Sequence, residues 1–274
     1  MEQTAEALLS PEFPPLLRQE LETGKSFPAA RQAALEAMGL EAELLTKPNN
    51  ILAVEYCKAI LSRGSTMEPM PMVREGSYHD ELPDPENPSA TAVRNLILGG
   101  GDWMKYIPEE TREIFEGASR HTLMAGELAV LARLRTMTEA EFEALPYGSE
   151  GLWRKFIAAC RSEATVEEIL VAVKSKRYTR TRLDRMLLCA FLGISGEMLA
   201  QPAPYTRVLA MNDRGREILK KARESGEFLH IGEKTDSPYW ELEQRCSDLY
   251  GLFCITGPEK PGMEPKRRLD YCKR

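Results

Sequence analysis

Four apolar stripes at helical spacing follow one another in the middle of the chain, and they limit the possible folds more than any other pattern. They occupy residues 127–134, 149–159, 165–173 and 181–191. In the fourth stripe, Leu183, Met186 and Leu187 fall on one face, which is the spacing of an amphipathic helix. We therefore expect a mainly helical region between about Pro108 and Leu199.

The pattern changes after the prolines at 202 and 204. TRVLAM, residues 206–211, and FLHIGE, residues 228–233, each have the composition of a strand. Between them, Asp213 is the expected N-cap of a helix that carries Ile218 and Leu219. A strand, helix, strand unit of this size pairs its two strands in parallel.

The first hundred residues contain helical segments separated by proline and glycine. Helices are predicted to follow Pro15, Ser26, Asn50 and Ser89. Residues 67–74 alternate like a strand, but Pro69 and Pro71 cannot donate hydrogen bonds to a neighbouring strand. We therefore expect an edge strand there, and a domain boundary near residues 101–108.

Composition excludes a disordered tail, a disulfide-stapled miniprotein and a membrane-spanning protein. Hydrophobic residues make up 43% and charged residues 28% of the chain, which is typical of a globular protein. The longest apolar stretch, Met186 to Ile194, has nine residues, about half of what a membrane-spanning helix needs. The six cysteines include no CxxC pair, which favours reduced thiols in a cytoplasmic protein without a bound metal.

Positive charge is concentrated in two segments, although the net charge of the chain is −6. Residues 174–185 hold six basic residues and one acidic residue, and residues 266–274 hold five basic residues and one acidic residue. Basic segments on an acidic chain indicate a binding surface for a polyanion. The alternative is a helix face whose charges are simply solvated.

Two short segments have the residue types of a nucleotide-binding site. In KPNN, residues 47–50, the amides of Asn49 and Asn50 precede a helix, where they cap backbone N–H groups or reach a ligand. In VREGSYHDE, residues 73–81, Arg74 leaves a short strand at the end where open α/β folds bind ligands. For Arg74 alone, a surface salt bridge is the alternative.

A third segment, PSATAVR at residues 88–94, begins a helix with Ser89 and Thr91 in its first turn. Free N–H groups and the helix dipole favour phosphate at such a position, and Arg94 lies one turn further on. Capping of the helix by Ser89 is the alternative, and it requires neither Thr91 nor Arg94.

In combination, the order of the motifs resembles the bacterial tRNA(Met) cytidine acetate ligase family, a branch of the adenylating nucleotidyltransferases. The motifs are GKSFPAARQAAL, KPNNILAVEYCKAI, VREGSYHDE, PSATAVRNLI, SEGLWRKF, KSKRYTRTRLDRMLL and YTRVLAMNDRGREIL. The resemblance implies an α/β fold class. Residues 1–104 would form the C-terminal part of a Rossmann-like nucleotidyltransferase domain. Residues 105–274 would form a mainly helical tRNA-binding region with the small strand, helix, strand unit.

The resemblance also assigns residues to binding sites. The ATP-binding set is Asn49, Arg74, Glu75, Ser89, Thr91 and Arg94. The tRNA-binding set is Lys174, Lys176, Arg177, Arg180, Arg182 and Arg185. ATP would be a substrate accompanied by Mg²⁺, and no catalytic residue is assigned.

One departure from the family pattern is large, because the HxGH signature that holds the triphosphate has no counterpart here. His79, His121 and His230 are expected to be isolated from one another. An acid–base or metal pair of His79 and Asp80 is disfavoured, because the sequence has only three histidines and offers no third ligand. The chain therefore matches the later part of the family pattern. We expect a truncated form, or a separate N-terminal chain that supplies the missing part.

The implied function is an ATP-dependent acetate ligase acting on the wobble cytidine of elongator tRNA(Met), through acetyl-adenylate. Acetate and tRNA would be its partners, with no membrane and with self-association as a homo-oligomer. Two alternatives remain open: a catalytically inactive tRNA-binding module, and a small-molecule adenylyltransferase. Salt-sensitive tRNA binding separates the last alternative from the other two.

Overall fold

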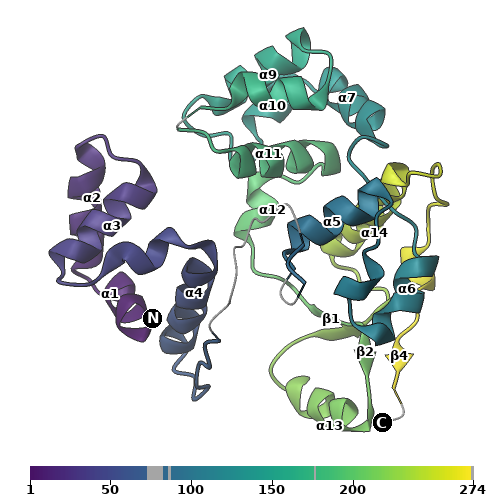
Figure 1. Cartoon of the computed structure of the whole chain (residues 1–274), viewed down its shortest axis with the longest axis horizontal. Coiled ribbons are helices and arrows are strands. Elements are labelled where there is room, and N and C mark those ends of the chain that lie inside the picture. The colour runs from purple at the N-terminus through teal and green to yellow at the C-terminus, as the bar shows by residue number, and fades with distance from the viewer. Residues whose placement is uncertain (73–82, 86–87, 176, 273–274) are drawn as a thin grey trace. The chain divides into compact units, whose positions relative to one another are not determined.

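The computed structural model describes residues 1–72, 83–85, 88–175 and 177–272. It divides into two units, Met1–Arg112 and Glu113–Arg274, and each is described here by itself. Figure 1 labels the main elements. The roles expected for residues 1–104 and 105–274 stay predictions.

All regular elements in the described part of the first unit are helices. Its elements are α1 (Glu2–Leu9), α2 (Phe13–Glu22), α3 (Phe27–Ala37), the 3₁₀ helix η1 (Ala42–Thr46), α4 (Pro48–Ser62), α5 (Ala90–Gly99) and the 3₁₀ helices η2 (Met104–Tyr106) and η3 (Glu109–Thr111). Gly24 and Gly39 follow α2 and α3 in the left-handed conformation, with φ of 84° and 79°. They end these helices as the sequence predicts.

Small side chains build the core of the first unit. The buried cluster comprises Ala5, Ala7, Phe13, Ala34, Leu35, Ala42, Leu45, Val54 and Cys57. Alanine lets helix backbones approach closely. Helix α5 contributes no residue to this cluster.

The edge strand expected in residues 67–74 is not present in its described part. Residues 67–72 have no regular secondary structure, and residues 73 and 74 lie outside the described residues. Pro69 and Pro71 remove two of the backbone donors that a ladder would need. Met70 and Met72 are more than four-fifths exposed, so no strand or helix of the described residues covers them.

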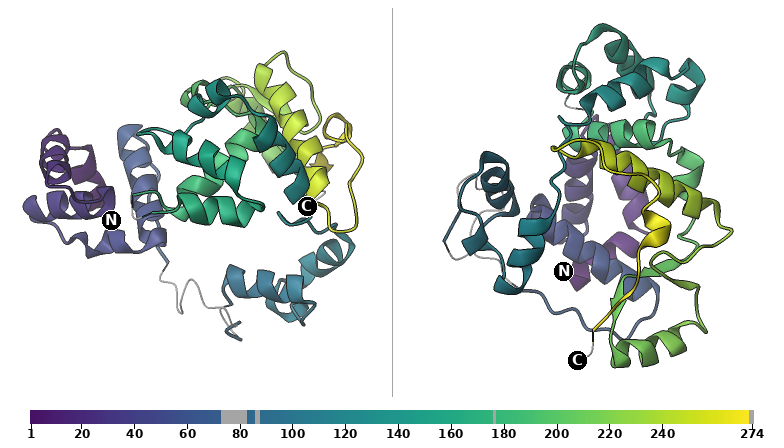
Figure 2. Two further views of the ribbon diagram at one scale, coloured as in Figure 1. Left: turned by 90° about the horizontal axis from the view of Figure 1, so that it is seen from above. Right: turned by 90° about the vertical axis from the view of Figure 1, so that its right-hand side faces the viewer.

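The second unit is built around four helices. It contains α6 (Arg112–Gly117), α7 (Glu127–Thr136), α8 (Glu139–Glu143), α9 (Leu152–Ser162), α10 (Val166–Val173), α11 (Arg180–Leu192), α12 (Gly196–Ala200), α13 (Asp213–Ala222), α14 (Pro238–Tyr250) and the 3₁₀ helices η4 (Gly251–Phe253) and η5 (Glu264–Lys266). Helices α7, α9, α10 and α11 share one core, in which Phe142, Phe156 and Met186 are fully buried. Figure 2 shows this group of teal and green helices from two further directions.

All four apolar stripes therefore form helices, as predicted. The second helix begins at Leu152 rather than at Ser149. Glu150 and Gly151 have φ of 62° and 77°, a left-handed conformation that cannot belong to a right-handed helix.

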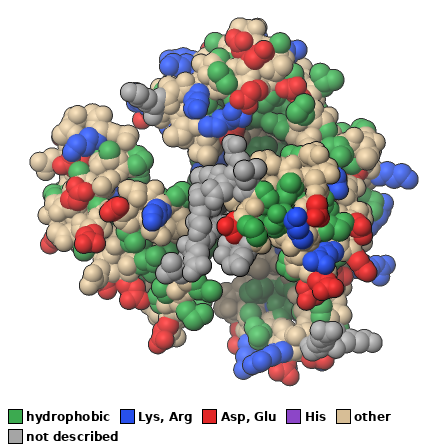
Figure 3. All heavy atoms as spheres, viewed as in Figure 1, with side chains coloured by type: hydrophobic (Ala, Val, Ile, Leu, Met, Phe, Trp, Pro, Cys, Tyr) green, Lys and Arg blue, Asp and Glu red, His purple; other side chains and the backbone are tan. Residues whose placement is uncertain are grey.

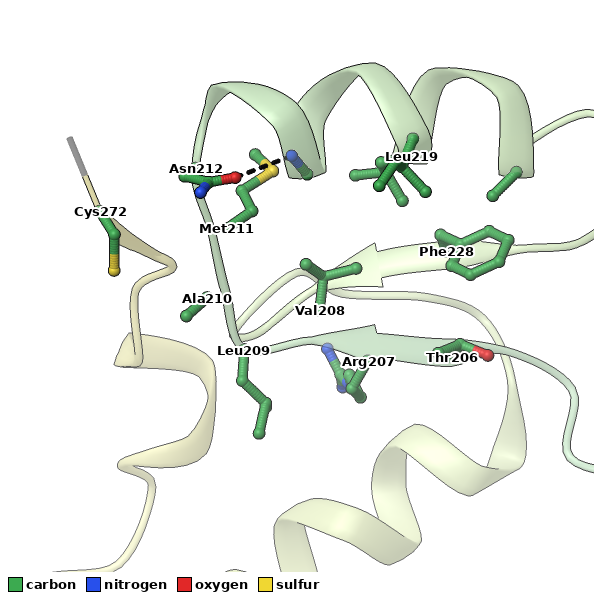
Figure 4. Close-up of a pocket in the computed structure, with 13 residues that line it drawn as sticks. Thr206, Arg207, Val208, Leu209, Ala210, Met211, Asn212, Leu219, Phe228 and Cys272 are labelled. Atoms are coloured by element: carbon green, nitrogen blue, oxygen red, sulfur yellow. Dashed lines mark hydrogen bonds between the residues drawn. The ribbon is translucent and has the colours of Figure 1, made fainter. Parts of the chain in front are cut away.

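The strand, helix, strand unit is confirmed. Strand β1 (Thr206–Val208) pairs in parallel with β3 (Phe228–His230), and α13 connects them. Figure 4 shows Val208, Leu219 and Phe228 directed into the space of about 740 Å³ between α13 and the strands. The prediction that Asp213 caps α13 is wrong, because the Asn212 side chain accepts the hydrogen bond from the Gly215 N–H at 2.9 Å.

The strand predicted at residues 206–211 is divided into β1 and β2 (Ala210–Met211). Strand β2 pairs in parallel with β4 (Asp270–Tyr271), which has no counterpart in the sequence prediction. The described residues thus form a mixed α/β protein that is mostly helical with few parallel strands. All six cysteines are free thiols. Among the described helices, none combines the length and apolarity needed to cross a bilayer.

Candidate functional site

The first candidate segment lies at the N-terminus of α4. The helix begins at Pro48, so Asn49 and Asn50 lie inside its first turn rather than before it. Lys47 is the N-cap residue, and its side chain makes no capping hydrogen bond. The first turn of a helix leaves its N–H groups without partners inside the helix. The exposed Asn49 therefore stands at a helix end that attracts anions.

The second candidate segment lies at the N-terminus of α5. Ser89 is almost fully buried, and its hydroxyl accepts a hydrogen bond from the Ala92 N–H at 3.0 Å. The capping role of Ser89 is therefore confirmed. Thr91 is half-buried in the first turn, and Arg94 is exposed on the same helix. A helix N-terminus with an exposed guanidinium one turn along can hold a phosphate group.

Two residues of the predicted ATP set, Arg74 and Glu75, lie outside the described residues, as do His79 and Asp80. Among the described members, Asn49 belongs to the helix group that shares the first unit's core, whereas α5 stands outside that core. The assembly of these segments into one ATP site stays a prediction.

In the second unit, Arg177, Arg180 and Arg182 of the predicted tRNA-binding set donate hydrogen bonds to neighbouring groups. Arg180 donates to both carboxylate oxygens of Glu167 at 2.7 Å and to Asp184 at 2.8 Å. Its guanidinium lowers the pKa of Glu167, and the two carboxylates raise the pKa of Arg180. Two carboxylates around one guanidinium cancel its charge locally, so Arg180 adds little positive potential to the surface.

Arg182 is bound to the turn that precedes α9. Its Nε donates to the Tyr147 carbonyl at 2.9 Å and its Nη2 to the Ser149 hydroxyl at 3.0 Å. The partners are uncharged, so the positive charge of Arg182 is not neutralised by them. Arg182 therefore combines a structural role with a contribution to surface potential.

Three cations surround the ring of Tyr178, and we call Lys155, Arg177, Tyr178 and Arg182 the Tyr178 cluster. The Lys155 Nζ lies 5.6 Å, the Arg177 guanidinium 6.0 Å and the Arg182 guanidinium 5.4 Å from the ring centroid. Tyr178 is buried, and its hydroxyl donates to the Glu150 carbonyl at 3.1 Å. The ring face partly compensates the repulsion between the cations.

One carboxylate opposes the Tyr178 cluster. Arg177 donates to Glu150 at 3.0 Å, and this contact lowers the pKa of the Glu150 carboxyl. Lys174 and Arg185 are exposed, and no ion pair of the described residues includes them. Lys176 lies outside the described residues. Figure 3 shows Lys and Arg side chains gathered on one flank of the α9–α11 region.

His121, which the sequence sets apart from the other histidines, lies among side chains of other types. Its Nε2 lies 3.2 Å from Glu259, and its ring stacks on Tyr250 with centroids 4.1 Å apart. The Cys254 thiol lies within 4.8 Å of both ligand atoms. No sequence signal connects His121 with the other two residues, because more than a hundred residues separate them along the chain.

Comparisons with known proteins agree over most of the chain. A model of the HIGH nucleotidyl transferase family matches residues 1–261. The tRNA(Met) cytidine acetate ligase of Alkaliphilus metalliredigens is 33% identical over 260 residues, covering 84% of this chain and 61% of that protein. The tRNA(Met) cytidine acetate ligase of Kosmotoga olearia is 32% identical over 306 residues, covering 94% of this chain and 70% of that protein. The chain thus spans about 60–70% of the length of these relatives.

Comparison with solved structures also indicates similarity to this family. The apo crystal structure of Thermotoga maritima TmcAL matches 100% of this chain and 74% of that chain, with a TM-score of 0.84 and 26% identity. The structure of that protein bound with alpha-thio ATP matches with a TM-score of 0.80 and 25% identity, covering 100% of this chain and 73% of that one. The chain therefore belongs to the HIGH nucleotidyl transferase family, and within it to the tRNA(Met) cytidine acetate ligases.

Proposed function

We propose that this chain carries the ATP-binding helix ends and the tRNA-binding surface of a tRNA(Met) cytidine acetate ligase. The observation that carries the proposal is the similarity over the whole chain to a structure bound with alpha-thio ATP. The alternative of a small-molecule adenylyltransferase does not account for the cations of the Tyr178 cluster.

The reaction would begin with acetate, which is already an anion and needs no general base. A carboxylate oxygen attacks the α-phosphorus of ATP, and the bond from that phosphorus to the pyrophosphate oxygen breaks. The products are acetyl-adenylate and pyrophosphate. Catalysis of such a step consists of positioning and of stabilising the negative charge that develops on pyrophosphate. The N-termini of α4 and α5 and the guanidinium of Arg94 are suited to this task.

In the second step, N4 of the wobble cytidine attacks the carbonyl carbon of acetyl-adenylate, and AMP leaves. Proton loss from N4 completes the transfer. The cytosine has to leave its stack in the anticodon loop before it can reach the adenylate. Binding of the tRNA backbone by the Tyr178 cluster would hold the anticodon arm during this step.

The described members of the candidate ATP site do not form a site for Mg²⁺. Asn49, Ser89 and Thr91 offer amide and hydroxyl oxygens but no carboxylate, and Mg²⁺ is usually bound through one or two carboxylates together with substrate phosphates. Glu75, the carboxylate of the predicted set, lies outside the described residues. No step of the proposed reaction therefore depends on a metal ion held by these residues.

The test joins the 274 residues to the N-terminal segment of the Alkaliphilus metalliredigens relative, which would supply the residues that hold the triphosphate. We expect acetate-dependent exchange of pyrophosphate into ATP in the fusion and negligible exchange in the 274 residues alone, because these contain no HxGH stretch. The fusion is also expected to acetylate elongator tRNA(Met) and not a tRNA with a different anticodon loop.

Filter binding of the same tRNA to the 274 residues alone distinguishes the alternatives. Salt-sensitive binding with exchange in the fusion supports the ligase. Salt-sensitive binding without exchange in a folded fusion identifies the inactive tRNA-binding module. Exchange without tRNA binding identifies a small-molecule adenylyltransferase.

A further inference from the structure

Two segments far apart in the sequence meet in the second unit, outside the candidate ATP site and the Tyr178 cluster. Residues 120–122 run antiparallel to residues 253–255, with an isolated bridge between His121 and Cys254. The Thr122 N–H donates to the Phe253 carbonyl, and the Ile255 N–H donates to the Arg120 carbonyl, both at 2.9 Å. The backbone therefore fixes where the side chains of these segments can meet.

Packing beside this bridge is tight. Gly126 lies under the ring of Phe253, where a Cβ atom would come within 2.6 Å of a ring carbon. Phe253 also meets the ring of Phe191 edge-on, with centroids 5.3 Å apart. Residues 120–126 and 251–255 are thus held in one arrangement by the core of the unit.

Three side chains of different chemistry converge at the bridge: the imidazole of His121, the thiol of Cys254 and the carboxylate of Glu259. Their ligand atoms all lie within 4.8 Å of one another. Two of the three residues are well covered, because Cys254 is buried and the His121 side chain is 9% exposed. The Glu259 side chain is 39% exposed, which leaves a route from solvent.

Neighbouring groups support these three side chains. The Thr256 hydroxyl lies 3.2 Å from the Cys254 sulfur, and the Tyr250 ring stacks on His121. Side-chain hydrogen bonds from Ser119 and His121 orient the Glu259 carboxylate. Outer groups that orient ligands in this way are a regular part of protein metal sites.

We propose that His121, Cys254 and Glu259 bind one Zn²⁺ ion. Nitrogen, thiolate sulfur and carboxylate oxygen are the three donor types that zinc takes from proteins. Zinc to ligand distances of 2.0–2.3 Å in a tetrahedron place the ligand atoms about 3.3–3.6 Å apart. The His121 to Glu259 distance of 3.2 Å is close to this requirement, and the Cys254 sulfur lies within 4.8 Å of both atoms.

The ion would tie residues 119–122 to residues 254–259, and water would occupy the fourth position. Its binding releases the proton of the Cys254 thiol, because only the thiolate is a zinc ligand. The apparent affinity for zinc should therefore fall as the pH is lowered. The site involves none of the residues assigned to ATP or tRNA, so its test is independent of the proposed function.

The experiment uses the full chain after dialysis against a chelator. Calorimetric titration with Zn²⁺ is expected to give one site per chain. Co²⁺ in place of zinc is expected to give the near-ultraviolet charge-transfer band of a thiolate ligand. Glu259→Gln, which alters a part-exposed side chain, should weaken zinc binding at least tenfold, because loss of even an outer-shell partner of a metal site costs about tenfold or more.

Cys254→Ser should abolish the cobalt band, and Cys272→Ser, which removes an exposed thiol elsewhere in the unit, should leave it unchanged. Circular dichroism confirms the fold of each variant; if Cys254→Ser does not fold, the Glu259→Gln result and the native cobalt spectrum decide. Absence of zinc binding, a cobalt spectrum without the thiolate band, or unchanged affinity in Glu259→Gln would overturn the proposal.

Discussion

The guanidinium of Arg207 donates from both Nε and Nη2 to one carboxylate oxygen of Glu243, at 3.0 and 2.7 Å. Its Nη1 donates to the carbonyls of His230 and Glu233, both at 3.0 Å. The same guanidinium lies 4.2 Å from the Trp240 ring centroid. Arg207 belongs to β1 and Glu243 to α14, so one side chain fastens the parallel strand pair to the helix beside it.

Replacing Arg207 with alanine is expected to destabilise the second unit. The Arg207 side chain is only 14% exposed, and its loss leaves two carbonyls and a carboxylate without their donor, which costs on the order of 2–4 kcal/mol. Urea unfolding followed by circular dichroism measures the change. Arg216→Ala is the matched control, because its pair with Asp213 is exposed on both sides and contributes little. Equal stability of the two variants would contradict the anchoring role.

Lowering the pH should reduce the stabilisation that Glu141 gives to the N-terminus of α8. Hydrogen bonds from the Thr138 N–H, the Arg133 guanidinium and the Thr138 hydroxyl lower the pKa of Glu141 from 4.5 to about 2. A carboxylate with a depressed pKa in the folded state stabilises that state above the unfolded pKa. Its contribution is therefore complete above about pH 4.5 and is lost as the pH falls through about 2.

Glu141→Gln keeps an oxygen that can accept the capping hydrogen bond but removes the charge. We expect this variant to be less stable than the native chain at pH 7 and equally stable once the pH is below about 2. Urea unfolding at a series of pH values measures the difference. A difference that does not shrink on acidification would contradict the role of the Glu141 charge.

Alanine variants of Arg182 and Arg185 should distinguish an effect on the free energy of unfolding from an effect on tRNA binding. Arg182→Ala removes hydrogen bonds to Tyr147 and Ser149 and should cost about 1–2 kcal/mol of unfolding free energy. Arg185→Ala alters an exposed side chain and should leave stability within about 0.5 kcal/mol. Each arginine that contacts a phosphate contributes about 0.7–0.9 to the slope of log affinity against log salt. An unchanged slope in Arg185→Ala would remove this residue from the proposed tRNA surface.

The helices of the second unit could be predicted because their apolar spacing and their packing agree. Leu183, Met186 and Leu187 are predicted on one face of α11, and all three are buried. Glycines 24 and 39 end α2 and α3 for a local reason, the left-handed backbone that glycine adopts easily. Features encoded within a few neighbouring residues are thus accessible from sequence.

Features that depend on distant partners were not predicted. Strand β4 has two residues and no periodic pattern of its own, and pairing with β2 defines it. Arg180 belongs to a basic run in the sequence, but Glu167 on α10 neutralises it in the fold. Lys155 lies outside that run and joins it around Tyr178. Charge counted along a chain therefore differs from charge on the folded surface.

The candidate ATP site can be tested at Arg94, which is exposed on α5 beyond the capped helix start. If its guanidinium contacts a phosphate of ATP, Arg94→Ala removes a charge-assisted hydrogen bond worth about 1.5–3 kcal/mol. In the fusion that carries the N-terminal segment, the KM for ATP in acetate-dependent exchange should rise about tenfold or more. Arg63→Ala is the control, because Arg63 follows the opposite, C-terminal end of α4 and is also exposed. Salt-dependent tRNA binding should be the same in both variants, because α5 lies outside the Tyr178 cluster. An unchanged KM in Arg94→Ala would exclude this arginine from the ATP site and leave the α5 terminus with the capping role of Ser89 alone.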